Sequence, residues 1–154
     1  MEDAREQLAG ATGASAAEII FTSGGTEANT LALRGLAAAQ GCKSVIVSGI
    51  EHASVLAVVP GATVIASDLR GAVDLNALED ALKTLPRPAL ICLMLANNET
   101  GVLQPLDAAI VLARTYGAYL HCDAVQALGK LPIDFSTLVV DSMSLSGHKV
   151  GGLK

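Results

Sequence analysis

Short apolar segments alternate with longer helical segments along the chain, and this alternation constrains the fold more than any other feature. The apolar segments predict strands at residues 19–22, 44–48, 62–66, 89–95, 118–120 and 143–146. Helical composition or periodicity predicts helices at residues 2–9, 30–40, 52–59, 75–85 and 106–116. Because the connections are too long for hairpins, the pattern predicts an α/β fold with a mainly parallel sheet and helices on both faces.

The longest apolar run, residues 89–96, predicts a strand that is covered on both faces of the sheet. It is far shorter than the roughly 18 residues that a membrane-spanning helix requires. Hydrophobic residues make up 51% of the chain and charged residues only 16%. This balance is typical of the interior of a larger protein.

The helix at residues 75–85 carries the clearest boundary signals. Asp74 is a suitable N-cap, and Pro86 and Pro88 prevent the helix from continuing. Pro105 marks the start of the helix at residues 106–116 in the same way.

Charge and cysteine usage exclude several classes of partner. The net charge is −5 without a basic stripe, and aromatic residues make up 3% of the chain, which argues against nucleic acid as a partner. Cys42, Cys92 and Cys122 form no C-x-x-C pair and have apolar neighbours, which predicts buried thiols in a reducing cytoplasm. No basic, apolar-cored leader opens the sequence, so we expect neither secretion nor a membrane partner.

Polar clusters follow the predicted strands, at the points where each strand ends. They comprise residues 23–26, His52, residues 97–100, residues 123–126 and residues 146–149. The carboxyl ends of parallel strands share one edge of a sheet, and ligands bind outside that edge. We therefore expect the five clusters to lie around one site.

The last two clusters contain residues suited to holding a pyridine cofactor. Alternation along the strand at 118–120 would place His121 and Asp123 on one face and Cys122 on the other. Lys149 could form a Schiff base with pyridoxal 5′-phosphate (PLP) while Asp123 keeps the pyridine nitrogen protonated. On chemistry alone, His52, His121 and Asp123 could instead bind a metal, or the polar sheet end could have no ligand.

The first cluster has the form of an anion cradle. A strand at 19–22, the sequence Ser-Gly-Gly-Thr and a helix follow one another directly. Glycines allow backbone N–H groups to approach an anion, and the helix N-terminus contributes a favourable dipole. Neither a Walker loop nor a G-x-G-x-x-G motif is present.

Taken together, the motifs resemble those of the cysteine desulfurases in the class V aminotransferase family. They read, in order, F-T-S-G-G-T-E-A-N, E-H, N-N-E-T-G, H-C-D-A-V-Q with G-K-L-P-I-D, and S-G-H-K, and they extend from about residue 19 to residue 149. The resemblance implies a three-layer α/β/α domain with PLP as cofactor.

The resemblance also implies a role for each site residue. Lys149 would bind PLP covalently and transfer protons, and His52 would stack on the ring and take part in proton transfer. The other cofactor-binding residues would be Asp123 at the pyridine nitrogen, Gln126 at the phenolic oxygen, Gly25, Thr26, Ser146 and His148 at the phosphate, and Asn98 beside the ring and the substrate carboxylate. Adjacent strand-end residues point in different directions, so Asn97 is an alternative to Asn98.

The implied reaction converts L-cysteine to L-alanine and leaves a persulfide sulfur for iron-sulfur clusters or other sulfur transfer. The implied partners are a second subunit of a homodimer and a sulfur-acceptor or scaffold protein. Alternatives within the fold are another class V aminotransferase or a selenocysteine lyase. Alternatives of another class are a metal-dependent hydrolase and a catalytically silent chain.

Relative to the family pattern, we expect residues 1–154 to form only part of the PLP-binding large domain. The segment before the first helix and the small C-terminal domain are expected to be absent. In the family that domain carries the catalytic cysteine and an arginine that binds the substrate carboxylate. None of the three cysteines matches that cysteine in position, so we expect no turnover by this chain alone.

Overall fold

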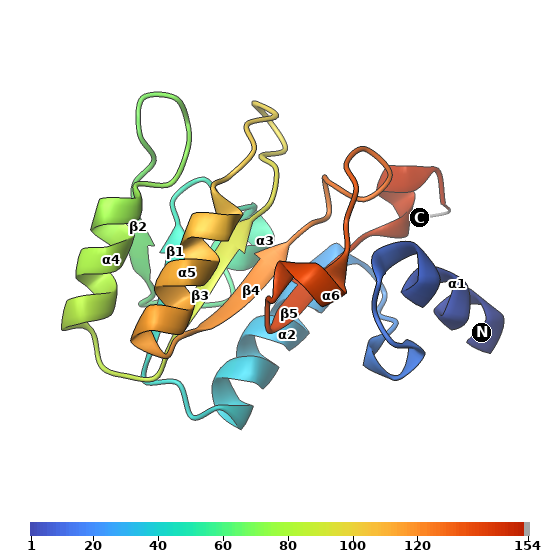
Figure 1. Ribbon diagram of the computed structural model, residues 1–154, viewed down its shortest axis with the longest axis horizontal. Helices are drawn as coiled ribbons and strands as arrows, with labels where there is room; N and C mark the ends of the chain where they lie inside the picture. Colours follow the sequence, from blue (N-terminus) through green and yellow to red (C-terminus); the bar gives the residue numbers. More distant parts are fainter. Residues whose placement is uncertain (153–154) are drawn as a thin grey trace.

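Five parallel strands form one sheet in the computed structural model, which describes residues 1–152 (Figure 1). The strands are β1 (Ser44–Ser48), β2 (Thr63–Ile65), β3 (Ala89–Met94), β4 (Tyr119–Asp123) and β5 (Ser142–Ser144), in the order β2-β1-β3-β4-β5. In the central pair, Ile91 of β3 is in register with Leu120 of β4. The predicted α/β fold with a parallel sheet is confirmed.

Strand β3 lies at the centre of the sheet and is buried along its whole length. Its side chains alternate between the two faces, as the pleat requires. Ile91 and Leu93 belong to one hydrophobic cluster, and Leu90 and Cys92 belong to the other. The continuous apolar run therefore indicated a strand that is covered on both sides.

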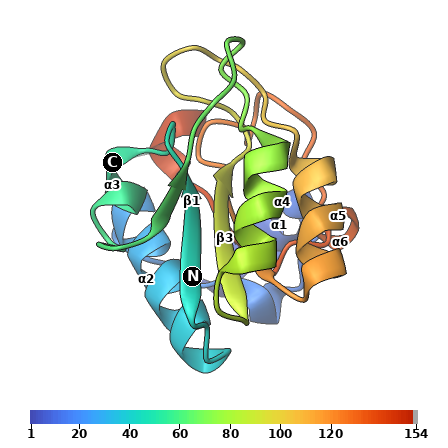
Figure 2. The same cartoon turned by 90° about the vertical axis from the view of Figure 1, so that its left-hand side faces the viewer.

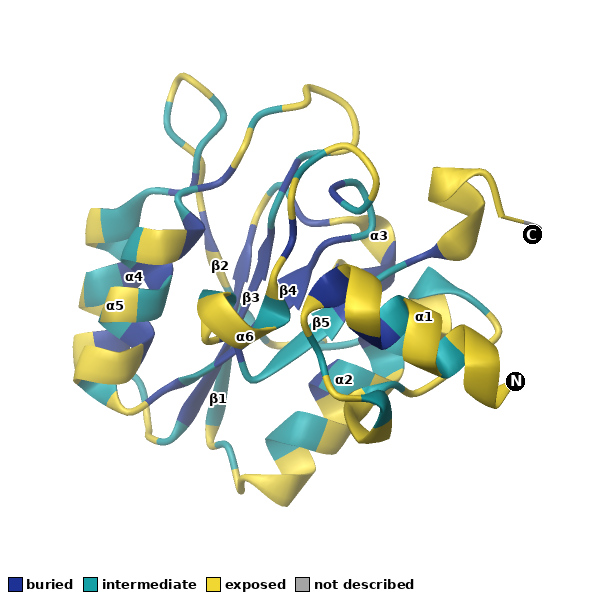
Figure 3. Ribbon diagram, turned by 45° about the vertical axis from the view of Figure 1, so that its right-hand side comes forward, coloured by how far each residue is buried: buried dark blue, intermediate teal, exposed yellow. Residues whose placement is uncertain are grey.

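Helices cover both faces of the sheet (Figure 2). On one side lie α4 (Leu75–Thr84) and α5 (Leu106–Tyr116), and on the other α2 (Gly25–Ala39) and the short α3 (Ala53–Leu56). Asp74 caps α4 as predicted, because its Oδ1 accepts hydrogen bonds from the N–H groups of Asn76 and Ala77 at 2.9 and 3.2 Å. The buried sheet and the exposed outer helix surfaces are separated clearly in Figure 3.

The remaining helices lie at the ends of the chain and beside the sheet. They are α1 (Glu2–Thr12), the 3₁₀ helix η1 (Ala16–Glu18), α6 (Phe135–Leu138) and the 3₁₀ helix η2 (Gly147–Val150). Among residues 1–152, no helix combines the length and the apolar character needed to cross a bilayer.

The prediction of a strand at residues 19–22 is wrong. The segment pairs with no strand, Ile20 is 70% exposed, and the carbonyl of Ile19 accepts a hydrogen bond from the Arg5 guanidinium instead. An apolar segment becomes a strand only when the fold places it alongside a sheet edge, and local sequence does not report that placement. The first polar cluster therefore follows an irregular segment, and only the other four follow strands.

Two helix boundaries also differ from the prediction. Helix α2 begins at Gly25 and not at residue 30, so the Gly-Thr pair forms its first turn. The helix after His52 spans only Ala53–Leu56 and does not reach residue 59.

Candidate active site

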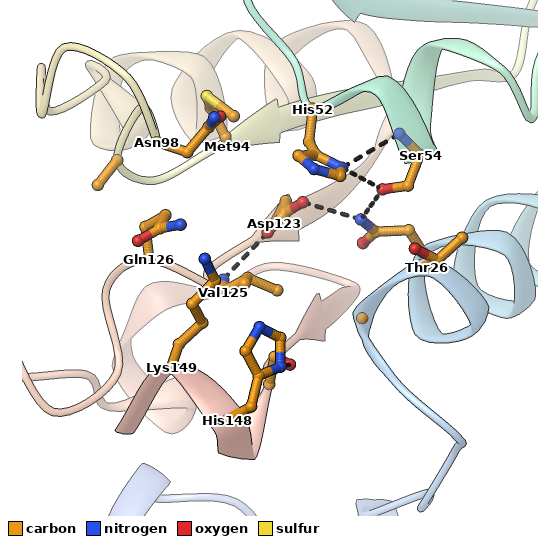
Figure 4. A pocket seen from close by; sticks show the side chains of 14 residues that line it. Thr26, His52, Ser54, Met94, Asn98, Asp123, Val125, Gln126, His148 and Lys149 are labelled. Atoms are coloured by element: carbon orange, nitrogen blue, oxygen red, sulfur yellow. Dashed lines mark hydrogen bonds between the residues drawn. The ribbon is translucent and has the colours of Figure 1, made fainter. Parts of the chain in front are cut away.

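All nine residues predicted to form the site line one cavity of about 250 Å³ at the carboxyl edge of the sheet (Figure 4). They are Gly25, Thr26, His52, Asn98, Asp123, Gln126, Ser146, His148 and Lys149. The chain runs from β1 outward to β2 and then returns to β3 on the other side of β1. The cavity thus lies near the point where the strand order reverses, which is where open α/β sheets bind ligands.

Asp123 is the last residue of β4 and is only 5% exposed at the base of the cavity. Its Oδ2 accepts a hydrogen bond from Asn29 Nδ2 at 2.8 Å, and its Oδ1 accepts one from the backbone N–H of Val125 at 3.0 Å. Each carboxylate oxygen retains a lone pair, since each can accept two hydrogen bonds. The carboxylate is thus held in place and can still receive a protonated ring nitrogen.

The start of α2 provides the anion-binding part of the cavity. No side chain caps this helix, so the N–H groups of its first turn have no intrahelical or capping partner. A Cβ added to Gly25 would lie 3.4 Å from Val125 Cγ2 and 3.8 Å from Ser146 Oγ, so a larger side chain here would occupy the cradle. Ser146 Oγ lies 2.8 Å from His148 Nδ1, which adds two polar side chains to the same end. These groups fit a phosphate dianion.

Lys149 lies in η2, three residues after the N-cap residue Ser146, and is exposed. A hydrogen bond from the Lys149 N–H to the Ser146 carbonyl, at 3.1 Å, fixes the backbone of this turn. Figure 4 shows the lysine side chain pointing toward Asp123, and both residues line the cavity. An amine and a carboxylate thus face the same space from different strand ends.

His52 occupies the N-cap position of α3, directly after the turn that follows β1. Its Nδ1 accepts a hydrogen bond from the Ser54 backbone N–H at 3.1 Å and lies 2.8 Å from Ser54 Oγ. These contacts fix the imidazole at the wall of the cavity. The ring can therefore stack on a flat ligand without reorientation.

The structure separates the two adjacent asparagines. Asn97 is occupied by the backbone: its Oδ1 accepts from the N–H groups of Glu99 and Thr100, and its Nδ2 donates to the Ile50 carbonyl at 3.0 Å. Asn98 is exposed and lines the cavity. Asn98 is therefore the residue that can meet a ligand.

Gln126 lies in the turn after β4 and lines the cavity opposite the start of α3 (Figure 4). Its Oε1 accepts a hydrogen bond from Lys130 Nζ at 2.9 Å. The amide nitrogen is left as a donor for a ligand oxygen.

Sequence reasoning missed Asn29 and Ser54, which also line the cavity. Asn29 is part of the T-E-A-N motif, but the helix was expected to begin only at residue 30. With the helix starting at Gly25, Gly25 and Asn29 are four residues apart and share one helix face. That spacing was the signal that could have identified Asn29.

The metal-site alternative finds no support in the geometry. His121 is fully buried, and its Nδ1 and Nε2 lie 2.8 Å from Ser142 Oγ and 3.2 Å from Asn29 Oδ1, so both ring nitrogens are engaged. Burial lowers the pKa of His121 to about 4. Within residues 1–152, no three His, Cys, Asp or Glu side chains are grouped so that they could hold a metal ion.

The three cysteine thiols are poor nucleophiles. Cys92 and Cys122 are completely buried, and burial raises the pKa of each thiol well above its ordinary value. Burial also raises the pKa of the half-buried Cys42. A thiol is a nucleophile only as the thiolate, so none of the three suits sulfur transfer.

Glu51, the first residue of the E-H motif, is a buried carboxyl group to which the sequence analysis assigned no role. It is 6% exposed, its Oε1 accepts a hydrogen bond from the Met94 N–H at 2.7 Å, and its Oε2 lies 3.8 Å from Cys92 Sγ. Burial raises the pKa of Glu51 to about 8, and the charge of Asp123 acts in the same direction, although the Met94 hydrogen bond opposes both. Glu51 is therefore mostly protonated at neutral pH.

The raised pKa of Glu51 predicts a loss of stability as the pH rises. The unfolded chain releases this proton near pH 4.5, whereas the folded chain keeps it until about pH 8, so the free energy of unfolding falls across that interval. The lowered pKa of His121 has the opposite effect on stability, but only below its ordinary pKa of 6.5. Of these two groups, only Glu51 therefore changes the free energy of unfolding between pH 6.5 and pH 8. We expect a fall of about 2 kcal/mol over this window in the protein without PLP, and none in Glu51→Gln.

Urea unfolding at pH 6.5 and pH 8 measures this difference, with the exposed Glu6→Gln as the matched control. An equal dependence of stability on pH in Glu51→Gln and the parent would contradict the protonated state assigned to Glu51.

Comparison with known proteins identifies the family to which the chain is similar. Residues 1–154 match the protein-family profile described as Aminotransferase class-V. A cysteine desulfurase of Cereibacter sphaeroides is 47% identical, over 89% of this chain and 37% of the relative. The cysteine desulfurase IscS of Dictyoglomus turgidum is 40% identical, over 100% of this chain and 41% of the relative. The chain thus spans less than half the length of these curated relatives.

Solved structures of related proteins superpose on almost the whole of this chain. The NifS-like protein of Rickettsia africae ESF-5 superposes with a TM-score of 0.89 and 33% identity, over 99% of this chain and 44% of that protein. A structure of SspA in complex with cysteine superposes with a TM-score of 0.85 and 34% identity, over 99% of this chain and 46% of SspA.

Proposed function

The chain belongs to the aminotransferase class-V family, whose cysteine desulfurase members are PLP-dependent, and on this premise we propose that it forms the PLP-binding part of a cysteine desulfurase. The observation that carries the proposal is the meeting of Asp123, Lys149 and the uncapped start of α2 around one cavity. A carboxylate, an amine and an anion cradle are the three protein groups that hold the pyridine nitrogen, the aldehyde carbon and the phosphate of PLP.

When bound, PLP supplies an electron sink that stabilises negative charge at the substrate carbon. Asp123 would keep a proton on the ring nitrogen, because its charge favours the pyridinium form. Lys149 would hold the cofactor through Nζ and, once released from it, would accept a proton from the substrate. Gly25 and Thr26 would bind the phosphate with their backbone N–H groups, assisted by Ser146 and His148.

The other side chains orient the ring and the substrate. The flat imidazole of His52 would cover one ring face, and the amide of Gln126 would donate a hydrogen bond to the phenolic oxygen. The exposed amide of Asn98 would position the substrate carboxylate. Each assignment uses a side chain that lines the cavity.

The proposed substrate is L-cysteine, and the products are L-alanine and a sulfur atom carried on a thiol. The related SspA has been solved in complex with cysteine, which supports this choice by similarity. The three thiols of this chain are buried or half-buried with raised pKa values, so the accepting thiol would come from outside these 154 residues.

The remaining parts of the proposal concern assembly and location. We propose a homodimer that passes sulfur to an acceptor or scaffold protein, for iron-sulfur clusters or another sulfur-containing product. Unpaired thiols favour a reducing compartment such as the cytoplasm, although a related cysteine desulfurase of Drosophila melanogaster is named mitochondrial.

The test uses the full-length protein, purified with PLP and supplied with L-cysteine and a small thiol. We expect L-alanine and sulfide in equal amounts. Formation of a keto acid from the amino acid would instead indicate an aminotransferase. Alanine release from selenocysteine without release from cysteine would indicate a selenocysteine lyase. Neither product with any of these amino acids would overturn the enzymatic proposal.

A further inference from the structure

At the wall of the cavity, a buried asparagine connects four polar side chains from three other elements, α3, β4 and β5. Asn29 of α2 is 1% exposed. Its Nδ2 donates to Asp123 Oδ2 at 2.8 Å and to Ser54 Oγ at 3.1 Å, while its Oδ1 accepts from Ser144 Oγ and lies 3.2 Å from His121 Nε2. Every polar atom of this amide is therefore engaged with a side chain.

The Asp123 carboxylate determines which way the Asn29 amide points. An ionised carboxylate only accepts hydrogen bonds, so the amide NH₂ must face Asp123 and the amide oxygen must face the other side. A flipped amide would place two oxygens 2.8 Å apart in a buried site. The partners of Asn29 are consistent with this single orientation.

The orientation of Asn29 determines the hydrogen on Ser54. The Ser54 hydroxyl oxygen accepts a hydrogen bond from Asn29 Nδ2, so its own O–H is free to donate to His52 Nδ1 at 2.8 Å. The Ser54 backbone N–H also points at His52 Nδ1, at 3.1 Å. Two donors meet at one nitrogen, so that nitrogen must be a lone-pair acceptor. The neutral imidazole of His52 then carries its proton on Nε2.

His121 stabilises the opposite side of Asn29. Because Asn29 Oδ1 is an acceptor, His121 donates from Nε2, and its Nδ1 accepts from the Ser142 hydroxyl. Burial lowers the pKa of His121 to about 4, so this ring stays neutral and does not change its hydrogen-bonding role at physiological pH. The orientation of the amide is thus supported from both sides.

We propose that Asn29 is a positioning residue that fixes the Asp123 carboxylate and, through Ser54, the tautomer of His52. As a result, the resting His52 presents an N–H and not a lone pair at Nε2. His52 can then donate a proton or a hydrogen bond to a ligand, but it cannot act as a base until Ser54 releases Nδ1. The tautomer stands independently of the ligand, whereas its use toward PLP or cysteine rests on the proposed function.

The tautomer can be read directly by NMR. The full-length protein, labelled with ¹⁵N-histidine and free of PLP, is studied about two units above the ordinary histidine pKa, with His52 assigned by the signals that disappear in His52→Gln. We expect a protonated Nε2 and an unprotonated Nδ1 for His52, and the same for His121. A proton on His52 Nδ1 would overturn the proposal, and this result requires no folded Asn29 variant.

The positioning role is tested by replacing the amide. Asn29→Asp keeps the shape but cannot donate to Asp123, and Asn29→Ala removes the group. We expect both to raise the dissociation constant of PLP about threefold to tenfold, because the Asp123 carboxylate that would receive the ring nitrogen is no longer held in place. Ser54→Ala should leave the Asp123 contact and the backbone N–H donor to His52 Nδ1 intact, so we expect the Nε2-protonated tautomer of His52 to remain the major form but in a smaller excess, with nearly unchanged PLP affinity. Asn76→Ala, on α4 and away from the cavity, is the matched control.

The outcomes distinguish a failure of the positioning role of Asn29 from a failure of the proposed function. Parent-like PLP affinity in a folded Asn29→Asp would show that the amide only fills space, and would overturn the positioning role. If a variant does not fold, the tautomer measured in the parent still decides the proposal. Failure of the parent itself to bind PLP would contradict the proposed function but leave the tautomer result valid.

Discussion

Lys149→Ala is expected to remove covalently held PLP and to lower alanine formation from cysteine by roughly three orders of magnitude or more. Lys149 is the only lysine among the described residues that line the cavity. An alanine can neither bond the cofactor nor accept the substrate proton, so two functions are lost together. The phosphate cradle at Gly25 and Ser146 is unchanged, so weak, non-covalent PLP binding should remain.

Two measurements on the full-length protein check this result: visible absorbance after exhaustive dialysis, and alanine production. Lys83→Ala is the control, because Lys83 lies on α4 in exposed ion pairs with Glu79 and Asp80. An absorbance and a rate equal to those of the parent would mean that Lys149 has no part in the reaction.

Asp123→Asn is expected to slow removal of the substrate Cα proton by about a hundredfold or more, while PLP affinity changes much less. The amide has no charge with which to keep the ring nitrogen protonated. It would also place an NH₂ against either Asn29 Nδ2 or the Val125 N–H, which are both donors. The residues proposed to bind the phosphate, at the start of α2 and at Ser146 and His148, do not include Asp123 and are left unchanged.

The rate of proton removal is measured by the exchange of the cysteine Cα proton with deuterated solvent. The PLP affinity is measured by titration of the protein with PLP. Asp107→Asn, an exposed carboxylate in the first turn of α5, is the control. Equal exchange rates in Asp123→Asn and the parent would exclude the role assigned to Asp123.

The layout of the fold was predictable because most of it follows from local pattern. The apolar run of β3 indicated burial on both faces, and Asp74 with its following leucines defined α4. The segment at residues 19–22 shows the limit of this reasoning. It has strand composition, but whether it pairs with a strand depends on where distant residues place it relative to the sheet. Its Ile19 carbonyl accepts a hydrogen bond from the Arg5 guanidinium instead.

The site was predictable where a residue lies at or just after the end of a strand, as Asp123 and Ser146 do. It was less predictable where the side-chain direction or helix start had to be known. Asn97 and Asn98 could be separated only by their contacts, and Asn29 was missed because the expected helix began at residue 30, five residues too late. The burial of Glu51 depends on Met94 and Cys92, which are more than 40 residues away in sequence.

The most direct test of the assigned cavity is to locate PLP on the protein. The full-length protein is incubated with PLP, reduced with borohydride to make the link permanent, digested and examined by mass spectrometry. We predict that the added mass lies on Lys149 and that prior replacement of Lys149 leaves no specific label. A label on Lys43, Lys83 or Lys130 with none on Lys149, or no label at all, would contradict the assignment of this cavity as the PLP site.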